Sequence, residues 1–512
     1  MSPSPGKWTL TATVMVGTIA TVLSATIVNV ALPDISGEFG LGQDEAQWLS
    51  TAFLAAMTAT MMAAAWAMGR FGTRATYAGA LLLFTLASIL GGLSPDQPLL
   101  ILARLLQGAA AGLVQPLAMV VIFRAFPPDQ RGTAMGVYGL GVILAPALGP
   151  TLGGMLIDAY SWRMVFFLGP PFTLAGIVLG LAVLPGRAAD APAKPFDLLG
   201  FVLLAVAIAA LLAALANGQR EGWDSGAVEG GFALALAATL AFVLHEHRTP
   251  HPILAIEVFR NPRFSAAAAV AFILGLGLYG STYLVPLFVQ GVQDFTPTES
   301  GLLLMPAGIV LGIVFPLAGR LSDRLPPYRM ILAGLALFGL SSLLSAEADA
   351  ATPFWTLAGW VALGRIGLGL ILPSMNVGAL RVLAPAEIPH GAGAINFMRQ
   401  LGGAIGVDLL AVALDRGTAL HADAFAAAQG QFAGPAARQT LDQLVILLTR
   451  AGIPDSVALP LHSLEASRFL SAMIGAQATV MGFRDGFLLV AALFFVALIP
   501  AWLMRPGRKG PG

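Results

Sequence analysis

Two stretches decide the fold of this chain: Ala65-Trp66-Ala67-Met68-Gly69-Arg70-Phe71-Gly72-Thr73-Arg74 and Gly319-Arg320-Leu321-Ser322-Asp323-Arg324-Leu325-Pro326. Each follows a long apolar run, combines Gly with Arg, and leads into another apolar run. Repeated halves in a membrane chain are a signature of transporter folds, in which two helical bundles move about a central site. The two stretches therefore predict a chain built from two related halves.

The composition agrees with a chain that lives in lipid. Of the 512 residues, 57% are hydrophobic and only 11% are charged, whereas about 25% are charged in an ordinary soluble domain. A soluble globule of this size could not hide so much apolar surface from water. The 27 basic and 27 acidic residues cancel, so no basic field exists to attract nucleic acid.

Several kinds of chemistry are excluded by residue type. The chain has no cysteine, which excludes disulfides, thiolate catalysis and Cys-based metal sites. His245, His247 and His251 cluster without the spacing of a zinc motif, so we expect a solvated loop and no metal. No phosphate-binding loop and no Ser-His-Asp arrangement can be proposed, so neither an enzyme nor a cofactor is expected.

The sequence contains apolar runs of the length that a membrane helix requires, about 20 residues. We find fourteen, and the first is too long for the apolar region of a signal peptide and is expected to remain uncleaved. They are 8–31, 46–68, 75–94, 98–123, 132–156, 164–184, 198–216, 227–244, 264–289, 299–319, 329–346, 354–380, 391–414 and 484–504.

The charges between the runs predict the orientation. With both termini in the cytoplasm, the inward-facing connections hold most of the Lys and Arg residues, and the short outward loops hold mainly Asp and Glu. One outward segment, 415–483, is long and polar, and Leu441, Leu444, Val445 and Leu448 predict a short amphipathic helix within it. We expect a multi-pass protein of the bacterial inner membrane, surrounded by membrane lipids.

Further motifs sharpen the comparison between the halves. The first run ends in Thr26-Ile27-Val28-Asn29-Val30-Ala31-Leu32-Pro33, the fourth contains Arg104-Leu105-Leu106-Gln107-Gly108, and the fifth contains Gly149-Pro150-Thr151-Leu152-Gly153-Gly154. Together with the repeated stretch, these motifs resemble the major facilitator superfamily, and within it the fourteen-helix drug:proton antiporter family. The resemblance extends from about residue 8 to residue 504.

The resemblance implies an all-α membrane fold of fourteen helices, in two six-helix bundles with an inserted helix pair. It implies an N-terminal bundle at 8–184, a linker and helices seven and eight at 185–263, and a C-terminal bundle at 264–504. The long outward segment 415–483 looks like that of the multidrug efflux subgroup that works with a periplasmic adaptor protein and an outer-membrane channel. By this resemblance, the repeated stretches are cytoplasmic gating loops, with Arg70, Gly72, Arg74, Gly319, Asp323 and Arg324 as their functional residues.

The chain departs from the family pattern at two positions. The family usually has Leu-Asp-x-Thr in its first helix, whereas Ser24 stands where that acid, a proposed proton handle, is expected. The loop motif usually has Asp before its Arg, whereas Gly69 precedes Arg70, and the second copy keeps Asp323 before Arg324. These departures put the usual proton coupling and the first gating loop in question.

Two charged residues inside apolar runs are the candidates for coupling. A charge in the bilayer is expensive, so Arg104 must be paired or face water, and we expect it to act in the translocation path rather than as a structural clamp. Asp408 lies within the thirteenth run, and a carboxyl group there could load and release a proton. Its alternatives are a position near the outer interface or a pairing with Arg399, which lies two helical turns earlier.

Polar and small residues inside the runs suggest a cavity and a hinge. Polar side chains in hydrocarbon need partners, so they should face the bundle interior, where they line a substrate cavity or join helices; they are Asn29, Gln115, Tyr138, Asn376, Asn396 and Gln400. Gly149, Pro150, Gly153 and Gly154 predict a hinge in the fifth run, since Gly permits close approach and Pro removes a hydrogen bond. Static helix packing is the alternative.

The sequence thus predicts an efflux transporter that exports amphipathic small molecules by alternating access, with protons as the driving ion. One alternative is a dedicated exporter of an endogenous lipid or metabolite without the usual proton coupling. Another is a membrane sensor or scaffold that transports nothing and engages a partner through 415–483.

Overall fold

The computed structural model describes residues 6–187, 195–431 and 459–506, and within them it contains helices and no strand. The elements are α1 (Lys7–Phe39), α2 (Gln43–Gly92), α3 (Gln97–Ala125), α4 (Arg131–Ala159), α5 (Met164–Phe167), α6 (Gly169–Val183), α7 (Leu198–Glu221), α8 (Gly226–Glu246), the 3-10 helix η1 (Ile256–Arg260), α9 (Pro262–Gly291), α10 (Pro297–Arg324), α11 (Pro327–Ser345), α12 (Phe354–Arg381), α13 (Ile388–Gln431), α15 (Leu459–Val496) and α16 (Leu498–Leu503).

The helices account for the expected membrane crossings. In the described part of the chain, twelve helical segments are long and apolar enough to cross a bilayer. One of them, Glu45–Gly92, has 48 residues, which is enough for two crossings at about 20 residues each. The 29-residue α4 adds another, so the fourteen runs of the sequence all fall on helices. The predicted all-α membrane fold is confirmed.

The two crossings of α2 meet at Gly72. This residue has φ +80° and ψ 163°, which breaks the helix between the second and third runs. A positive φ favours glycine because it has no Cβ. A Cβ at this position would also lie 2.7 Å from the backbone nitrogen of Arg187, at the end of the sixth run. Any other residue here would therefore meet both backbone strain and a steric clash.

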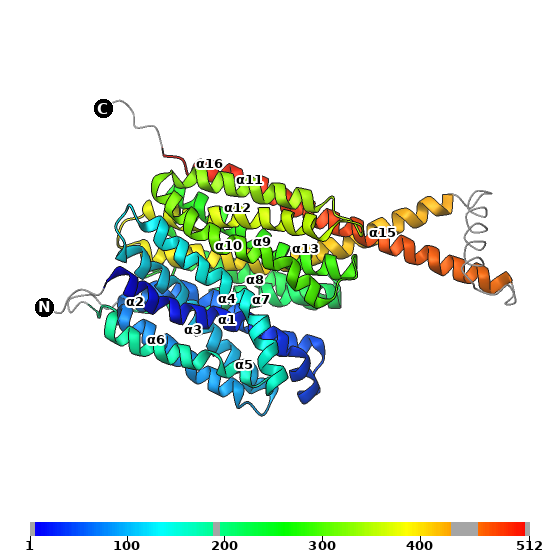
Figure 1. Cartoon of the computed structure of the whole chain (residues 1–512). Coiled ribbons are helices and arrows are strands. Elements are labelled where there is room, and N and C mark those ends of the chain that lie inside the picture. Colours follow the sequence, from blue (N-terminus) through cyan, green and yellow to red (C-terminus); the bar gives the residue numbers. More distant parts are fainter. Residues whose placement is uncertain (1–5, 188–194, 432–458, 507–512) are drawn as a thin grey trace.

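The first helix starts and the last helix ends at the same end of the bundle (Figure 1). We call this end, where Lys7 and Leu503 lie, the terminal end. At the opposite end, α13 and α15 extend beyond the other helices (Figure 1). We call their projecting parts, 415–431 and 459–483, the hairpin, and the end that carries them the hairpin end.

The hairpin corrects one expectation from the sequence. The segment 415–483 was expected to be a polar loop, but α13 continues to Gln431 and α15 begins at Leu459. The residues from 415 to 431 are rich in Ala, the strongest helix former, so the helix continues past the apolar run. His421 Nε2 lies 2.7 Å from Asp485 Oδ2 and joins the two helices near the base of the hairpin. The predicted amphipathic helix around Leu441–Leu448 lies outside the described residues.

The helices pack as two groups with one pair beside them. In the first group, α2 packs against α3 and α6, and α1 packs against α3, α4 and α6. In the second group, α9, α11, α12, α13 and α15 pack against one another, with α10 against α12. We call α1–α6 the first half and α9–α16 the second half. The inserted helices α7 and α8 pack mainly against each other, and α7 also touches α2 and α13.

The two halves meet through matching helices. The fifth crossing of the first half, α4, packs against α10 and α12, and the fifth crossing of the second half, α13, packs against α2 and α3. The approach is close because glycines line it: a Cβ on Gly132 would lie 2.4 Å from the Gly319 carbonyl oxygen. Small residues at helix contacts let backbones approach within van der Waals distance in a membrane.

Candidate functional site

Arg104 lies in the core of the first half and is fully buried. Its Nε donates to the Leu49 carbonyl at 3.0 Å, and its Nη1 donates to the Gln107 side chain at 3.0 Å. The guanidinium carbon lies 4.1 Å from the centre of the Phe53 ring, a position in which the ring face attracts a cation. Among the described residues, Nη2 has no hydrogen-bond partner.

Ser24 is the direct neighbour of this guanidinium. Nη1 of Arg104 lies 3.3 Å from Ser24 Oγ and 3.2 Å from the Ser24 carbonyl oxygen. Gln107 extends the network by donating to Ser88 Oγ at 2.8 Å. No carboxylate pairs with Arg104 in the described chain. The position where the family has an acid therefore presents a neutral hydroxyl to a buried cation.

A second polar cluster joins the two halves. Tyr138 of α4 donates to Asn396 of α13 over 3.4 Å. Arg399 Nη2 donates to Asn396 Oδ1 at 2.9 Å and lies 3.5 Å from Gln115 Oε1 of α3. All four side chains are buried. Three of the residues expected to line a substrate cavity, Gln115, Tyr138 and Asn396, are thus brought together at the interface between the halves.

Arg399 completes this cluster and was not predicted as a functional residue. It lies within the apolar run 391–414, so the rule that drew attention to Arg104, a charge inside a membrane helix, applies equally to it. Its hydrogen bonds go to amide oxygens of Asn396 and Gln115 rather than to an acid.

The other expected cavity residues lie apart from this cluster. Asn29 is exposed on α1 and accepts a hydrogen bond of 2.5 Å from the Ser50 hydroxyl. Gln400 is buried and accepts from the Tyr279 hydroxyl at 3.0 Å, within the second half. Asn376 is buried on α12. These three do not form one site with Gln115, Tyr138 and Asn396.

Asp408 is half-buried on α13. In the described chain it forms no ion pair, and Arg399, the alternative partner considered from the sequence, bonds elsewhere. Asp408 lies on α13 of the second half and Arg104 on α3 of the first half, and no ion pair joins them in the described chain.

The second gating stretch makes a direct contact between the halves at the terminal end. The Asp323 carboxylate accepts hydrogen bonds from the backbone nitrogens of Gly132, at 2.5 Å, and Thr133, at 3.0 Å. It also accepts one from the Thr133 hydroxyl at 2.6 Å. These are the first residues of α4, whose free N–H groups and positive dipole end favour a carboxylate. Arg324, the next residue, is exposed.

The first gating stretch makes contacts within its own half instead. Arg74 donates from its Nε to the Leu184 carbonyl at 2.7 Å, and its backbone nitrogen donates to the Pro185 carbonyl at 3.2 Å. Gly72 supplies the helix break described above, and Arg70 is exposed. A Cβ at Gly69 would meet no atom within 4 Å. The first copy thus lacks the carboxylate and leaves open space at that position.

The predicted hinge residues Gly149, Pro150, Gly153 and Gly154 all lie within α4, which is helical throughout. A Cβ on Gly149 would lie 2.3 Å from Thr26 Oγ1, and one on Gly153 would lie 2.9 Å from Ile27 Cγ1. Gly149 and Gly153 therefore allow α4 to lie tightly against α1, whereas Gly154 faces open space.

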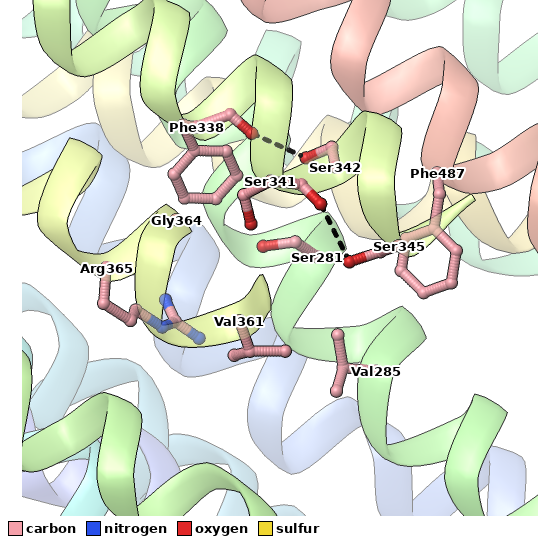
Figure 2. Close-up of a pocket in the computed structure, with 10 residues that line it drawn as sticks. All are labelled: Ser281, Val285, Phe338, Ser341, Ser342, Ser345, Val361, Gly364, Arg365 and Phe487. Carbon is pink, nitrogen blue, oxygen red and sulfur yellow. Dashed lines mark hydrogen bonds between the residues drawn. The ribbon is translucent and has the colours of Figure 1, made fainter. Parts of the chain in front are cut away.

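A third arginine inside a membrane helix was also missed from the sequence. Arg365 of α12 lies beside a small cavity of about 20 Å³, lined by serines of α9 and α11 and by Phe487 of α15 (Figure 2). Ser342 and Ser345 donate to carbonyls of their own helix, at 3.1 and 2.9 Å. The hydroxyl oxygens thus keep lone pairs free to accept further hydrogen bonds. Arg365 and Arg104 both lie on the fourth crossing of their halves.

No metal site is formed by three or more His, Asp or Glu side chains in the part of the chain that the structure describes.

Comparison with known proteins places these features in a family. The family described as "Major Facilitator Superfamily" matches residues 14–407. The chain belongs to this superfamily. It is therefore a membrane transporter rather than an enzyme, as the sequence predicted.

Relatives and solved structures agree with this membership. The chain is 33% identical over 401 residues to the "Multidrug resistance protein B homolog" of Mycobacterium tuberculosis, covering 77% of this chain and 73% of the relative. It is 31% identical over 414 residues to the "Tetracenomycin C resistance and export protein" of Streptomyces glaucescens, covering 79% and 75% of the two chains. The fold resembles the proton:xylose symporter XylE, with a TM-score of 0.60, 14% identity, and 97% and 95% of the two chains covered.

Proposed function

We propose that this transporter exports amphipathic small molecules from the cytoplasm by alternating access. The support comes from the names of two relatives: a protein named for tetracenomycin C resistance and export, and one named as a multidrug resistance protein homologue, each match more than three quarters of the chain. The apolar interior with few charges suits cargo that partitions into lipid.

The observation that carries the mechanism is the distribution of contacts between the halves. The hydrogen bonds that we find between them in the described chain form two groups. At the terminal end they join Asp323 to α4 and Arg124 to the Pro385 carbonyl. Nearer the middle, Arg399 bonds to Gln115, and Asn396 bonds to Tyr138 and to the Met119 sulfur. They lie at the terminal end and around the middle of the helices. A transporter that is closed at one end and free to separate at the other is in one of the two states that alternating access requires.

In this proposal the bundles 8–184 and 264–504 rock against each other, with helices seven and eight as the inserted pair of 185–263. The terminal end faces the cytoplasm, because the basic residues concentrate there. The buried cluster of Gln115, Tyr138, Asn396 and Arg399 contacts cargo when the halves part. Gly149, Pro150, Gly153 and Gly154 let α4 bend or slide against α1 during the transition.

Proton movement is the proposed driving force. A proton that moves inward gains about 2.3 kcal/mol for each 100 mV of membrane potential. Arg104 and Asp408 are the proposed coupling residues, and the hairpin is the proposed contact for a periplasmic adaptor protein that leads to an outer-membrane channel.

The test is transport by the purified protein in liposomes. Vesicles are loaded with buffer of one pH and diluted into another, and accumulation of a lipophilic fluorescent cation or a hydrophobic antibiotic is followed with and without a protonophore. We expect the molecules that are inserted inside-out to drive uptake of the compound into liposomes with an acidic interior, and this uptake should collapse when the protonophore is added. Absence of flux for a panel of such compounds would contradict the export proposal.

One observation favours a second candidate, an exporter of a single endogenous lipid or metabolite without the usual proton coupling. Arg104 faces Ser24 rather than an acid, so the proton handle of the family is missing from its usual place. In the liposome experiment this candidate gives flux of one compound class that persists in the presence of the protonophore.

A further inference from the structure

A large cavity of about 790 Å³ lies at the terminal end, apart from the cluster between the halves. Four parts of the chain enclose it: the region around the break in α2 with the end of α3, Pro195 of the linker before α7, the segment 246–260 at the end of the inserted pair, and residues 386–390 around the start of α13. Its volume falls within the range of about 300–1,000 Å³ that is typical of small-molecule sites.

The charged groups of this cavity are mainly basic. Arg70, Arg124 and Arg260 line it, and in the described chain none of the three pairs with a carboxylate. Three histidines, His247, His251 and His390, also line it. The opposing groups are Glu246, which is buried and accepts from the Leu254 backbone nitrogen at 3.2 Å, and Glu257, which is exposed.

The cavity also has an apolar part. Trp66 and Met68 of α2 and Ile256 of η1 belong to its lining. The Trp66 ring lies 4.5 Å from the ring of Phe196, between ring centres, at a tilt of 53°, and Phe196 belongs to the linker before α7. A ligand of this cavity would therefore meet an aromatic and aliphatic surface on one side and guanidinium groups on another.

The repeat explains why the space exists. In the second copy of the gating stretch, the Asp323 carboxylate reaches across to the first residues of α4, the fifth crossing of the other half. In the first copy, the position before the Arg is Gly69, which lines the cavity and has open space where a side chain would be. Pro389 and His390, at the start of the matching fifth crossing α13, line the same cavity. Where the second copy has the Asp323 carboxylate, the first copy thus has Gly69 and a cavity lined by arginines.

We propose that this cavity binds an amphipathic organic anion, whose negative group lies among Arg70, Arg124 and Arg260 and whose apolar part lies against Trp66 and Ile256. Guanidinium groups form strong charge-assisted hydrogen bonds to carboxylate, sulfonate or phosphate oxygens. Because α2 and α3 belong to the first half and residues 386–390 to the second, the bound anion bridges the two halves at the terminal end. The site is additional to the proposed export path.

The test uses two probes that share a fluorescent ring system and differ in charge. 1-Anilinonaphthalene-8-sulfonate carries a sulfonate, and N-phenyl-1-naphthylamine lacks it. Each is titrated onto the full chain in nanodiscs of phosphatidylcholine, with empty nanodiscs as the blank. We expect saturable binding of the sulfonate at least about tenfold tighter than that of the neutral amine, since the arginines recognise only the anion.

Gly69 offers a matched pair of variants. Gly69→Asp places a carboxylate in the open space and should weaken binding of the sulfonate about tenfold. Gly69→Asn has the same size without the charge and should bind as the wild type does. Because a Cβ here meets no atom within 4 Å, both variants should fold, which their thermal unfolding in the same nanodiscs verifies. Equal affinities of the two variants, or of the two probes, would overturn the proposal.

The lipid composition of the nanodiscs distinguishes two sources of the anion, a lipid head group and a free organic anion. In nanodiscs that contain phosphatidylglycerol, competition for the sulfonate site would identify an anionic lipid head group as the natural occupant, and unchanged affinity would identify a free organic anion. Both results are consistent with the shared chemistry of the site. The binding measurement requires no transport, so its failure would leave the export proposal standing, and failure of export would leave the site standing.

Discussion

The Ser24 hydroxyl and the Nη1 atom of Arg104 lie 3.3 Å apart in the buried core of the first half. One is neutral and the other is a cation, and a second nitrogen of the same guanidinium, Nη2, has no hydrogen-bond partner in the described chain. A buried charge is costly unless hydrogen bonds or a counter-charge compensate it. The consequences for transport can be tested on either residue.

Arg104→Ala should abolish export while the protein remains folded. The substitution removes a cation held by Leu49, Ser24 and Gln107, and we expect flux in liposomes to fall at least about tenfold. Arg329→Ala, at an exposed position of the terminal end, is the matched control and should transport normally. Wild-type flux from Arg104→Ala would remove Arg104 from the mechanism.

Ser24→Asp should create an ion pair with Arg104 and a new titratable group in the first half. The carboxylate would accept from a guanidinium that now bonds only neutral groups, so we expect higher thermal stability and a pH profile of transport that differs from the wild type by about one unit or more. Ser24→Asn has a similar size and no charge, and should keep the wild-type profile. Identical profiles for the Asp and Asn variants would show that this position does not touch the coupling path.

Asp323→Asn should loosen the closed terminal end. The amide cannot reproduce the three charge-assisted hydrogen bonds to Gly132 and Thr133. The closed arrangement should therefore lose about 1.5–3 kcal/mol of stabilisation, which shifts the equilibrium at least about tenfold toward separated halves. Because the chain has no cysteine, Ser322→Cys, buried at this contact, can report the opening by its rate of maleimide labelling. We expect labelling to accelerate about tenfold in the Asp323→Asn background, and an unchanged rate would mean that the contact does not hold the end closed.

Gly108→Ala should destabilise the first half. The added Cβ would lie 2.2 Å from the Phe53 carbonyl oxygen, a backbone atom that cannot move away easily, so α3 must shift from α2 at a cost of about 1–3 kcal/mol. Gly359→Ala, where a Cβ meets no atom within 4 Å, is the control. The midpoint temperature of thermal unfolding in detergent should fall for Gly108→Ala and stay constant or rise for Gly359→Ala. Equal midpoints would show that the α2–α3 contact is looser than described.

Most of the fold could be predicted from the sequence, because the bilayer imposes one rule on every crossing. A helix satisfies its backbone hydrogen bonds within itself, as hydrocarbon requires, so runs of about 20 apolar residues locate the crossings. The rule fails outside the bilayer. No continuous apolar run marks residues 415–431 as helix, and their alanines become informative only once α13 is known to continue into them from the membrane.

The site could be predicted only in part. The sequence shows which polar or charged side chains are costly to bury in a membrane, but not which residues provide their hydrogen bonds. The intramembrane charge of Arg104 was evident, whereas its contacts with Leu49 and Ser24 bring together three crossings that are distant in sequence. Gln115, Tyr138 and Asn396 were expected to need partners, but the network that joins them to Arg399 depends on how α3, α4 and α13 pack. For the same reason, the sequence could not show that Asn29 and Asn376 lie apart from that cluster.

The 44-residue α13 carries Asn396 and Arg399 where the halves meet and then continues without interruption to Gln431. At 1.5 Å per residue it is about 66 Å long, roughly twice the thickness of the bilayer core. It therefore acts as a lever arm: a tilt of about ten degrees in the second half sweeps its tip through roughly 10 Å. A protein bound to the tip would therefore have to move with it in each transport cycle, or would slow the cycle by holding the tip in place.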